Sequence, residues 1–215
     1  MKKQRYRINF SKTEAMRFTG HLDLILTWER TFRRAGVPLA YSKGFSSRPL
    51  LNMAAPLPLG YTSTGEIGDF WLSEKIPSSD LITALINALP PGLIVHKAVE
   101  IENVYGPKLP SLVIAASYEV TLPKQSPGWD QTLEQLMNSS SLLRNRKGKT
   151  YDLRPLILTL ELVSSDNSKI EKLKMTLQSL PGLTGRPDEV IAALDLPTTD
   201  CRICRTEILL SSGKD

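Results

Sequence analysis

The chain has 215 residues, which is enough for one large domain or for two domains of about 100 residues each. Hydrophobic residues make up 41% of it, so either arrangement can bury a core, and the formal net charge is +5. No apolar run approaches the roughly 18 residues of a membrane span, and the basic start MKKQRYRINF is not followed by the apolar segment of an export signal. The sequence therefore predicts a cytoplasmic protein without a membrane partner.

The first predicted element is a half-buried strand over residues 4–10, where apolar and polar side chains alternate. From His21 the apolar spacing changes to three and four residues, which predicts a helix. We expect Thr19 to cap the start of this helix and Gly36 to follow its last turn. The helix face expected in the core consists of Leu22, Ile25, Trp28, Phe32 and Ala35.

Three further strands and one helix complete the first half of the chain. Their order predicts the split βαβ arrangement of a ferredoxin-like unit, a four-stranded antiparallel sheet with two helices on one face. The run NVYGPKLP within 103–110 reads as a linker. The strands are expected over 50–54, 67–72 and 93–101, and the helix over 80–89.

The second half is predicted to repeat the same order of elements. Strands are expected over 112–122, 152–163, 169–178 and 201–210, and helices over 129–137 and 187–194. We therefore predict an α+β fold of two tandem ferredoxin-like (βαββαβ) units with antiparallel sheets. The domains are placed at residues 1–104 and 110–215.

Cys201 and Cys204 are the only cysteines, and their C-x-x-C spacing is one that zinc and redox sites use. A four-ligand zinc site needs two more ligands, and the two histidines lie far away in the sequence. The surrounding run reads as a strand, where residues three apart point to opposite faces. We therefore predict structural or incidental cysteines and no bound metal or other cofactor.

Dense motifs in the first 60 residues carry a family resemblance. The chain contains FSKT from Phe10, RF at Arg17 and Phe18, HLDL from His21, RRAG from Arg33, PLAYS from Pro38 and PLPLG from Pro56, and later DLRPLI from Asp152 and GRPDEV from Gly185. These motifs resemble a bacterial family of radical-SAM-linked proteins of unknown function. The chain departs from that pattern at Thr19-Gly20 and at Ser46-Ser47-Arg48.

The resemblance implies a partner, not an activity. Members of that family are fused to, or encoded beside, radical-SAM proteins. A [4Fe–4S] cluster of the radical-SAM type needs three cysteine ligands, and this chain has two cysteines. The radical-SAM protein is therefore expected to be the partner of this chain.

The charges are unevenly placed, which points to an anionic partner. Residues 1–60 contain 11 Lys and Arg but only 3 Asp and Glu, whereas residues 61–140 contain 4 and 9. Such a basic region commonly binds nucleic acid, although it can also be charge that keeps a small domain soluble.

Three segments are candidate RNA- or anion-binding sites. In the loop YSKGFSSRP, cations flank an aromatic ring, so phosphate contacts and base stacking are both available; the alternative is a connector whose Phe45 fills the core. Residues near the first helix start can bind an anion, and the basic run after residue 143 can clamp phosphate or form a solvated hairpin. The predicted residues are Arg17, His21, Tyr41, Lys43, Phe45, Arg48, Arg144, Arg146, Lys147, Lys149 and Arg154.

No catalytic residue set is recognisable, and three functions remain open. The first is a non-catalytic module that binds or presents RNA for a radical-SAM protein. The second is a protein-interaction adaptor that touches no nucleic acid. The third is an enzyme that uses His21 among nearby cations.

Overall fold

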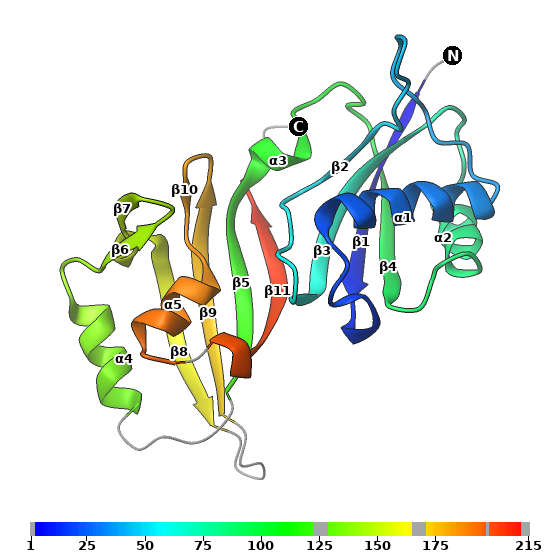
Figure 1. Ribbon diagram of the computed structural model, residues 1–215. Coiled ribbons are helices and arrows are strands. Elements are labelled where there is room, and N and C mark those ends of the chain that lie inside the picture. Colours follow the sequence, from blue (N-terminus) through cyan, green and yellow to red (C-terminus); the bar gives the residue numbers. More distant parts are fainter. Residues whose placement is uncertain (1–2, 123–128, 165–170, 197, 212–215) are drawn as a thin grey trace. The chain divides into compact units, whose positions relative to one another are not determined.

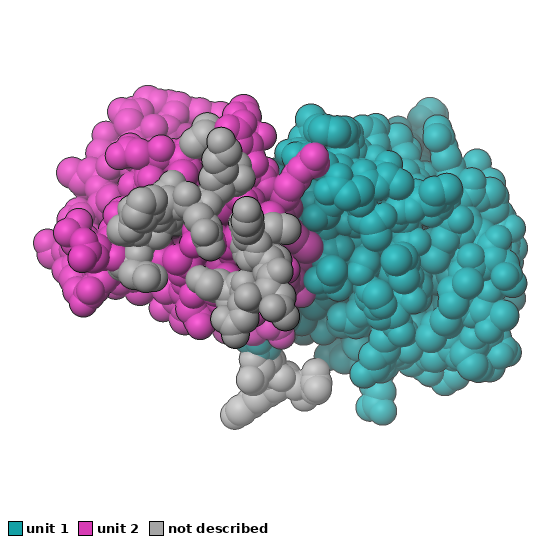
Figure 2. Space-filling model, turned by 90° about the horizontal axis from the view of Figure 1, so that it is seen from below, with its two compact units in different colours: residues 1–113, 210–215 teal, residues 114–209 magenta. Residues whose placement is uncertain are grey.

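The computed structural model describes residues 3–122, 129–164, 171–196 and 198–211. The chain divides into two compact units, coloured separately in Figure 2. Unit 1 comprises Met1–Val113 and Leu210–Asp215, and unit 2 comprises Ile114–Leu209. Both units combine helices with antiparallel strand pairs, so the fold class is α+β, as predicted.

Within the described residues, no helix combines the length and the apolar character that crossing a membrane requires.

Unit 1 has the element order strand, helix, strand, strand, helix, strand that the sequence predicts. Its strands stand in the order β2-β3-β1-β4, and the three neighbouring pairs are antiparallel (Figure 1). A four-residue helix and a 3-10 turn complete the unit. The bounds are β1 Gln4–Lys12, a 3-10 turn Glu14–Met16, α1 His21–Arg34, β2 Leu51–Met53, β3 Thr62–Leu72, α2 Ser78–Ile86, β4 Leu93–Ile101 and α3 Leu109–Leu112.

The core of unit 1 lies between its sheet and the helices α1 and α2. Tyr6, Ile8 and Phe10 alternate along β1, and all three are fully buried in one cluster with residues of both helices. Trp28 of α1 lies at the centre of an aromatic group, 4.9 Å from the Phe10 ring and 5.0 Å from the Phe70 ring between centroids. The predicted alternation of β1 is therefore confirmed.

Four of the five residues predicted for the core face of α1 lie in the core or against it, and Leu22 is the exception. Leu24 is buried with Trp28, whereas Leu22 is 74% exposed. Successive helical residues are about 100° apart, so Leu22 points to nearly the opposite side from Leu24. The helix begins at His21 with Gly20 as the N-cap residue, so the prediction of a Thr19 cap was wrong; Gly36 follows the helix with a φ of 68°, as expected.

Unit 2 contains more elements than were predicted. Its strands stand in the order β10-β9-β5-β11, and β8 pairs with β9. The helix α4 packs against β8, and a separate hairpin is formed by β6 and β7 (Figure 1). The bounds are β5 Val113–Thr121, α4 Trp129–Asn138, β6 Leu143–Arg146, β7 Lys149–Asp152, a 3-10 turn Arg154–Leu156, β8 Ile157–Ser164, β9 Glu171–Leu180, β10 Leu183–Thr184, α5 Pro187–Ala193, a 3-10 turn Thr198–Asp200 and β11 Arg202–Leu210.

The single strand predicted over 152–163 is wrong. A 3-10 turn interrupts it between β7 and β8, because Pro155 has no N–H to give to a strand ladder. Lys147 and Gly148 both have positive φ, the conformation of a tight two-residue hairpin turn, so the basic run folds back on itself. Residues 169 and 170 of the predicted strand 169–178 lie outside the described residues.

Candidate nucleic-acid interface

The loop between residues 41 and 49 is a closed, hydrogen-bonded turn. Tyr41 and Pro49 form an isolated antiparallel bridge at its base. The Ser42 N–H donates to the carbonyl oxygen of Arg48 at 2.8 Å, and the Arg48 N–H donates to the Ser42 hydroxyl at 3.0 Å. The Ser47 hydroxyl donates to the Ser42 carbonyl oxygen at 3.0 Å. These bonds hold the tip of the loop in a defined shape.

Phe45 stands at the tip of this loop and is fully exposed, with 112% of its reference surface. The alternative in which Phe45 fills the core is therefore wrong. The turn places Gly44 at a φ of 125°, a conformation that favours glycine. A large aromatic ring on a hydrogen-bonded turn offers a flat apolar face to solvent.

Two exposed cations flank Phe45 in the same loop. Neither Lys43 nor Arg48 forms an ion pair with another described residue. Tyr41, which is 39% exposed, donates a hydrogen bond to the Glu29 carboxylate at 3.2 Å, and this fixes the base of the loop to α1. Three of the four residues predicted for this loop, Lys43, Phe45 and Arg48, are exposed, whereas Tyr41 is bonded to α1 at the base of the loop.

Arg17 and His21 lie at the start of α1, where the sequence predicted an anion site. The Arg17 guanidinium donates through Nε to the Gly60 carbonyl oxygen at 2.7 Å and lies 5.1 Å from the centre of the Phe18 ring. His21 is the first residue of α1 and is half-buried. Arg17 therefore ties the segment before α1 to residue 60, a structural role that was not predicted.

The basic run of unit 2 forms the β6–β7 hairpin. Arg144 and Arg146 both pair with the Glu189 carboxylate of α5, at 3.3 and 3.7 Å. Lys147 and Lys149 are exposed at the turn and form no ion pair with another described residue. Two of the four hairpin cations are therefore partly neutralised and two remain available to an anion.

Arg154, which was predicted with this run, has a different role. Its guanidinium donates to the Met137 carbonyl oxygen at 3.0 and 2.7 Å and to the Ile157 carbonyl oxygen at 3.1 Å. These carbonyls lie near the end of α4 and at the start of β8. Arg154 thus satisfies backbone acceptors instead of projecting from the hairpin.

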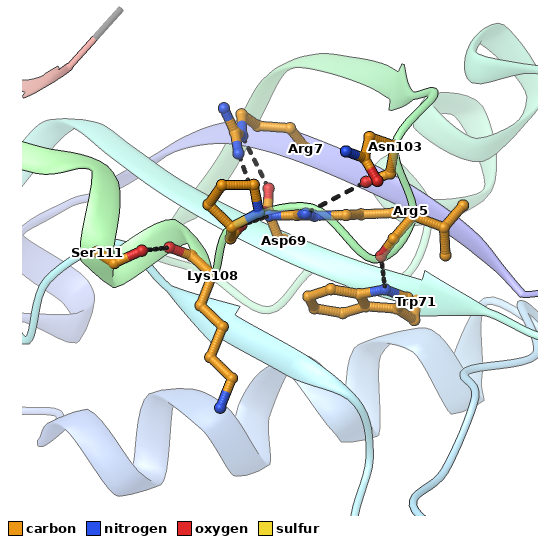
Figure 3. A network of polar contacts seen from close by, with 9 residues as sticks. Arg5, Arg7, Asp69, Trp71, Asn103, Lys108 and Ser111 are labelled. Atoms are coloured by element: carbon orange, nitrogen blue, oxygen red, sulfur yellow. Dashed lines mark hydrogen bonds and ion pairs between the residues drawn. The ribbon is translucent and has the colours of Figure 1, made fainter. Parts of the chain in front are cut away.

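A buried charge network, which sequence reasoning missed, lies on the other face of the unit 1 sheet (Figure 3). Arg5 is 2% exposed and Asp69 is fully buried, and both guanidinium groups of Arg5 and Arg7 donate to the Asp69 carboxylate. The Arg5 Nε lies 3.0 Å from Asp69 Oδ2, and the Arg7 Nε lies 2.8 Å from Asp69 Oδ1. The register of β1 on β3 places these side chains together, a long-range fact that no local pattern contains.

The same network holds residues 103–108, here called the strap, against the sheet. Arg5 donates to the carbonyl oxygens of Asn103 and Pro107, at 3.5 and 2.8 Å, and the Trp71 indole N–H donates to the Val104 carbonyl oxygen at 3.0 Å. The Arg5 guanidinium also lies 5.0 Å from the centre of the Trp71 ring. The segment predicted as a linker is therefore bonded to unit 1.

A pocket of about 350 Å³ lies beside the strap. Its walls come from the chain after the 41–49 loop, from Trp71 and from the strap itself. The side chains with polar or aromatic groups in its lining are Lys3, Asn52, Trp71, Tyr105 and Lys108. These aromatic and cationic residues were not recognised as a site from the sequence, because they lie in four separate segments of the chain.

The cysteines show no arrangement for metal binding or redox chemistry within the described residues. Cys201 is buried and Cys204 half-buried, and both are free thiols. Burial raises the pKa of the Cys201 thiol, which disfavours the thiolate that metals and disulfide exchange require. No group of three or more His, Cys, Asp or Glu side chains in the described part of the chain is placed to hold a metal ion.

One serine–histidine pair bears on the enzyme alternative. The Ser11 hydroxyl lies 2.6 Å from Nε2 of His96, and it also contacts the Thr64 carbonyl oxygen at 3.4 Å. A serine nucleophile needs a histidine that a further group orients. Within the described residues His96 has no hydrogen bond to a carboxylate, so the pair lacks the third member of a triad.

The geometry thus defines an α+β protein with an exposed aromatic and cationic loop and no assembled catalytic set within its described residues. The chain belongs to a bacterial family described as an uncharacterized protein conserved in bacteria (DUF2344), whose model matches residues 5–187. This match spans most of both units. The family description does not mention radical-SAM proteins, so that association stays a prediction.

Other comparisons add little. No curated protein matches the sequence. A protein of unknown function from Galdieria sulphuraria is 12% identical with a TM-score of 0.28, over 97% of this chain and 100% of that one. A protein described as a glycine cleavage system transcriptional repressor is 12% identical with a TM-score of 0.26, over 98% and 100%. At TM-scores this low, neither likeness supports a conclusion about fold or function.

Proposed function

We propose that this protein is a non-catalytic module that binds single-stranded or looped RNA through the basic surface of unit 1. The observation that carries the proposal is the 41–49 loop, which displays a fully exposed Phe45 between two cations on a hydrogen-bonded turn. Burying an aromatic ring is favourable, so leaving Phe45 in water has a cost that a ligand can recover.

The chemistry of the loop suits an unpaired nucleic-acid strand. Aromatic rings stack on bases of any sequence, and cations on either side contact the phosphates. Lys43 and Arg48 form no ion pair with another described residue, so their charges are not neutralised by a partner in the protein. Among the described candidates, the Lys147–Lys149 turn offers cations but no exposed aromatic ring at its tip, and it is the weaker site for RNA.

The partner and the finer fold class are part of the same proposal. We propose that the module serves a radical-SAM protein, on the strength of the motifs from Phe10 to Gly60. We also propose that both units are ferredoxin-like repeats. The order β2-β3-β1-β4 supports this for unit 1, and the order β8-β9-β5-β11 supports it for unit 2 with the β6–β7 hairpin as an insertion.

The test is a titration of labelled single-stranded RNA of about 12 nucleotides, a length within the range that single binding domains cover. Phe45→Ala is expected to weaken binding by about 1–3 kcal/mol through lost stacking. Lys43→Ala and Arg48→Ala are expected to weaken binding of all sequences, because they contact phosphate. None of the three substitutions should change the melting temperature measurably, since all three side chains are exposed.

Lys97→Ala is the matched control. Lys97 is an exposed lysine of β4, which lies at the opposite edge of the unit 1 sheet from β2. This variant should bind RNA as the wild type does. If Lys97→Ala and Lys43→Ala weaken binding equally, the attraction is general charge and the loop is not the site.

An apolar patch formed by Phe18, which precedes α1, and by two leucines of α1 favours the adaptor function as the second candidate. Phe18 and Leu22 are each 74% exposed and Leu26 is 46% exposed, at a spacing of four residues that places Leu22 and Leu26 on one helical face. Such a patch is typical of protein interfaces. If RNA binding fails while Leu22→Asp abolishes co-purification of a radical-SAM protein, the adaptor is the correct function.

A further inference from the structure

We propose that the pocket beside the strap binds one unstacked nucleobase of the RNA, an inference that rests on the proposed function of the 41–49 loop. The pocket volume of about 350 Å³ is at the lower end of the range for small-molecule sites. None of its side chains was a candidate from the sequence. The pocket selects one nucleotide by its base, whereas the loop alone binds RNA without preference for a sequence.

The pocket has a rigid wall because a buried ion pair fixes the strap. Burying a charged pair has a desolvation cost that the attraction between the charges seldom exceeds. We therefore look for the role of this ion pair in the residues that it positions. Asp69 pairs with the Arg5 guanidinium (Figure 3). The remaining N–H groups of Arg5 donate hydrogen bonds to the carbonyl oxygens of Asn103 and Pro107 in the strap. The result is a strap set at a defined distance from Trp71.

The strap turns sharply to present an aromatic ring. The Gly106 N–H donates to the Asn103 carbonyl oxygen at 3.1 Å, and a Cβ on Gly106 would lie 3.0 Å from the Asn103 side chain. Tyr105 at this turn is 87% exposed and lines the pocket together with the half-buried Trp71. A second aromatic ring is therefore displayed at a fixed place on the same unit as Phe45.

The lining offers groups for the base and the phosphate of a nucleotide. Trp71 and Tyr105 supply flat apolar surface for a base, and the Asn52 amide supplies both a donor and an acceptor for a base edge. Lys3 and Lys108 supply positive charge for phosphate. A nucleotide combines a flat ring, a hydrogen-bonding edge and an adjacent negative charge, and it is the ligand that the proposed RNA binding supplies.

The pocket is continuous with the loop along the chain. Pro49 and Leu50 line it, and they directly follow Arg48. The Tyr41–Pro49 bridge closes the loop at this point, so the loop base and the pocket rim share a residue. An RNA strand held by Arg48 can therefore place a neighbouring base in the pocket.

The experiment uses single-stranded RNA of about 12 nucleotides that carries 2-aminopurine at one position at a time. Anisotropy of an end label reports binding, and 2-aminopurine fluorescence reports stacking on an aromatic ring. We expect quenching at two positions, one that is lost in Phe45→Ala and another that is lost in Tyr105→Ala. Tyr105→Ala should weaken binding about 5- to 150-fold, the equivalent of one stacked base.

Two matched variants complete the design. Tyr105→Phe keeps the ring and should bind and quench as the wild type does. Lys108→Ala should flatten the salt dependence by about one phosphate contact, whereas Lys97→Ala should not. The melting temperature of each variant must equal that of the wild type, which is expected for side chains this exposed.

Failure of the pocket and failure of the loop give different results. If RNA binds and depends on Phe45, but Tyr105→Ala changes neither the affinity nor the quenching, the pocket inference is wrong and the proposed function stands. If RNA does not bind the wild-type protein, both are wrong. If Tyr105→Phe is as defective as Tyr105→Ala, Tyr105 does not act by stacking and the pocket inference is wrong.

Discussion

Arg5, Arg7 and Asp69 form a largely buried ion network with a substantial desolvation cost. The Asp69 carboxylate is fully buried and accepts hydrogen bonds from two guanidinium groups, one of which is also buried. Two cations around one anion leave the group positively charged, and the strap carbonyl oxygens supply further acceptors for Arg5. Removing Asp69 leaves the buried Arg5 guanidinium without its counter-ion.

The first prediction concerns this network. Asp69→Asn should lower the free energy of unfolding by about 3–5 kcal/mol, because two guanidinium groups lose their counter-ion and one of them is buried. The control is Glu100→Gln, which breaks the exposed Lys75–Glu100 pair and should cost less than about 1 kcal/mol. Chemical denaturation measures both, and a cost for Asp69→Asn no larger than the control would contradict the account.

The second prediction concerns Trp28. Trp28→Ala should cost about 3–5 kcal/mol, since the ring is fully buried against Phe10, Phe32 and Phe70. Leu22→Ala on the same helix should change stability by no more than about 0.5 kcal/mol, because Leu22 is exposed. Equal losses in denaturant melts of the two variants would mean that Leu22 is buried with Trp28.

The third prediction concerns the thiol of Cys201. Its pKa is raised by burial, so at a given pH less of it is thiolate than in a free cysteine. Alkylation by iodoacetamide, followed by mass spectrometry between pH 7 and 9, should therefore proceed more slowly at Cys201 than in an unstructured peptide and should accelerate as the pH rises. Faster modification than in the peptide would indicate an activated thiol.

At the scale of elements, the sequence predicted those helices and strands whose formation depends on a pattern of side chains within one segment. The alternation in β1 and the three-and-four spacing in α1 placed both elements, because each pattern repeats within one segment. The exposure of Leu22 escaped prediction because both Leu22 and Leu24 are apolar, and only packing in the core of unit 1 decides which of them is buried. The interruption before β8 had a local signal in Pro155, which was passed over.

The candidate site was only half predictable for a related reason. Lys43, Phe45 and Arg48 are neighbours in the sequence, so their loop could be recognised from composition. The pocket lining comes from four segments that the fold assembles, and the strap that completes it read as a linker. Arg5 and Asp69 are 64 residues apart, so no short segment of the sequence contains both partners of this buried ion pair.

At the scale of the whole molecule, each unit carries its own cation-rich surface. Unit 1 displays the 41–49 loop and the strap pocket, and unit 2 displays the Lys147–Lys149 turn beside a pocket of about 670 Å³. The two surfaces differ in how their charge is balanced. In unit 2, Glu189 and Asp188 pair with three arginines, whereas the loop cations of unit 1 have no ion-pair partner among the described residues.

The fourth prediction follows from this difference in charge balance. The double variant Lys147→Ala with Lys149→Ala should retain most of the affinity for single-stranded RNA, because the stacking surface lies in unit 1. The double variant Lys43→Ala with Arg48→Ala should lose two phosphate contacts. Equilibrium titration at one salt concentration compares the two, and a larger loss for the unit 2 variant would move the RNA site to the hairpin.

The most direct test of RNA binding is the dependence of affinity on salt. For single-stranded RNA the plot of log affinity against log salt concentration falls with a slope of about −0.7 for each phosphate contact. We predict a slope of −1.4 or steeper for the wild type, from about two contacts in the loop, and a slope shallower by about 1.4 for Lys43→Ala with Arg48→Ala. An affinity no better than about 10⁻⁴ M at physiological salt, together with a slope that this double variant leaves unchanged, would contradict the RNA-binding function.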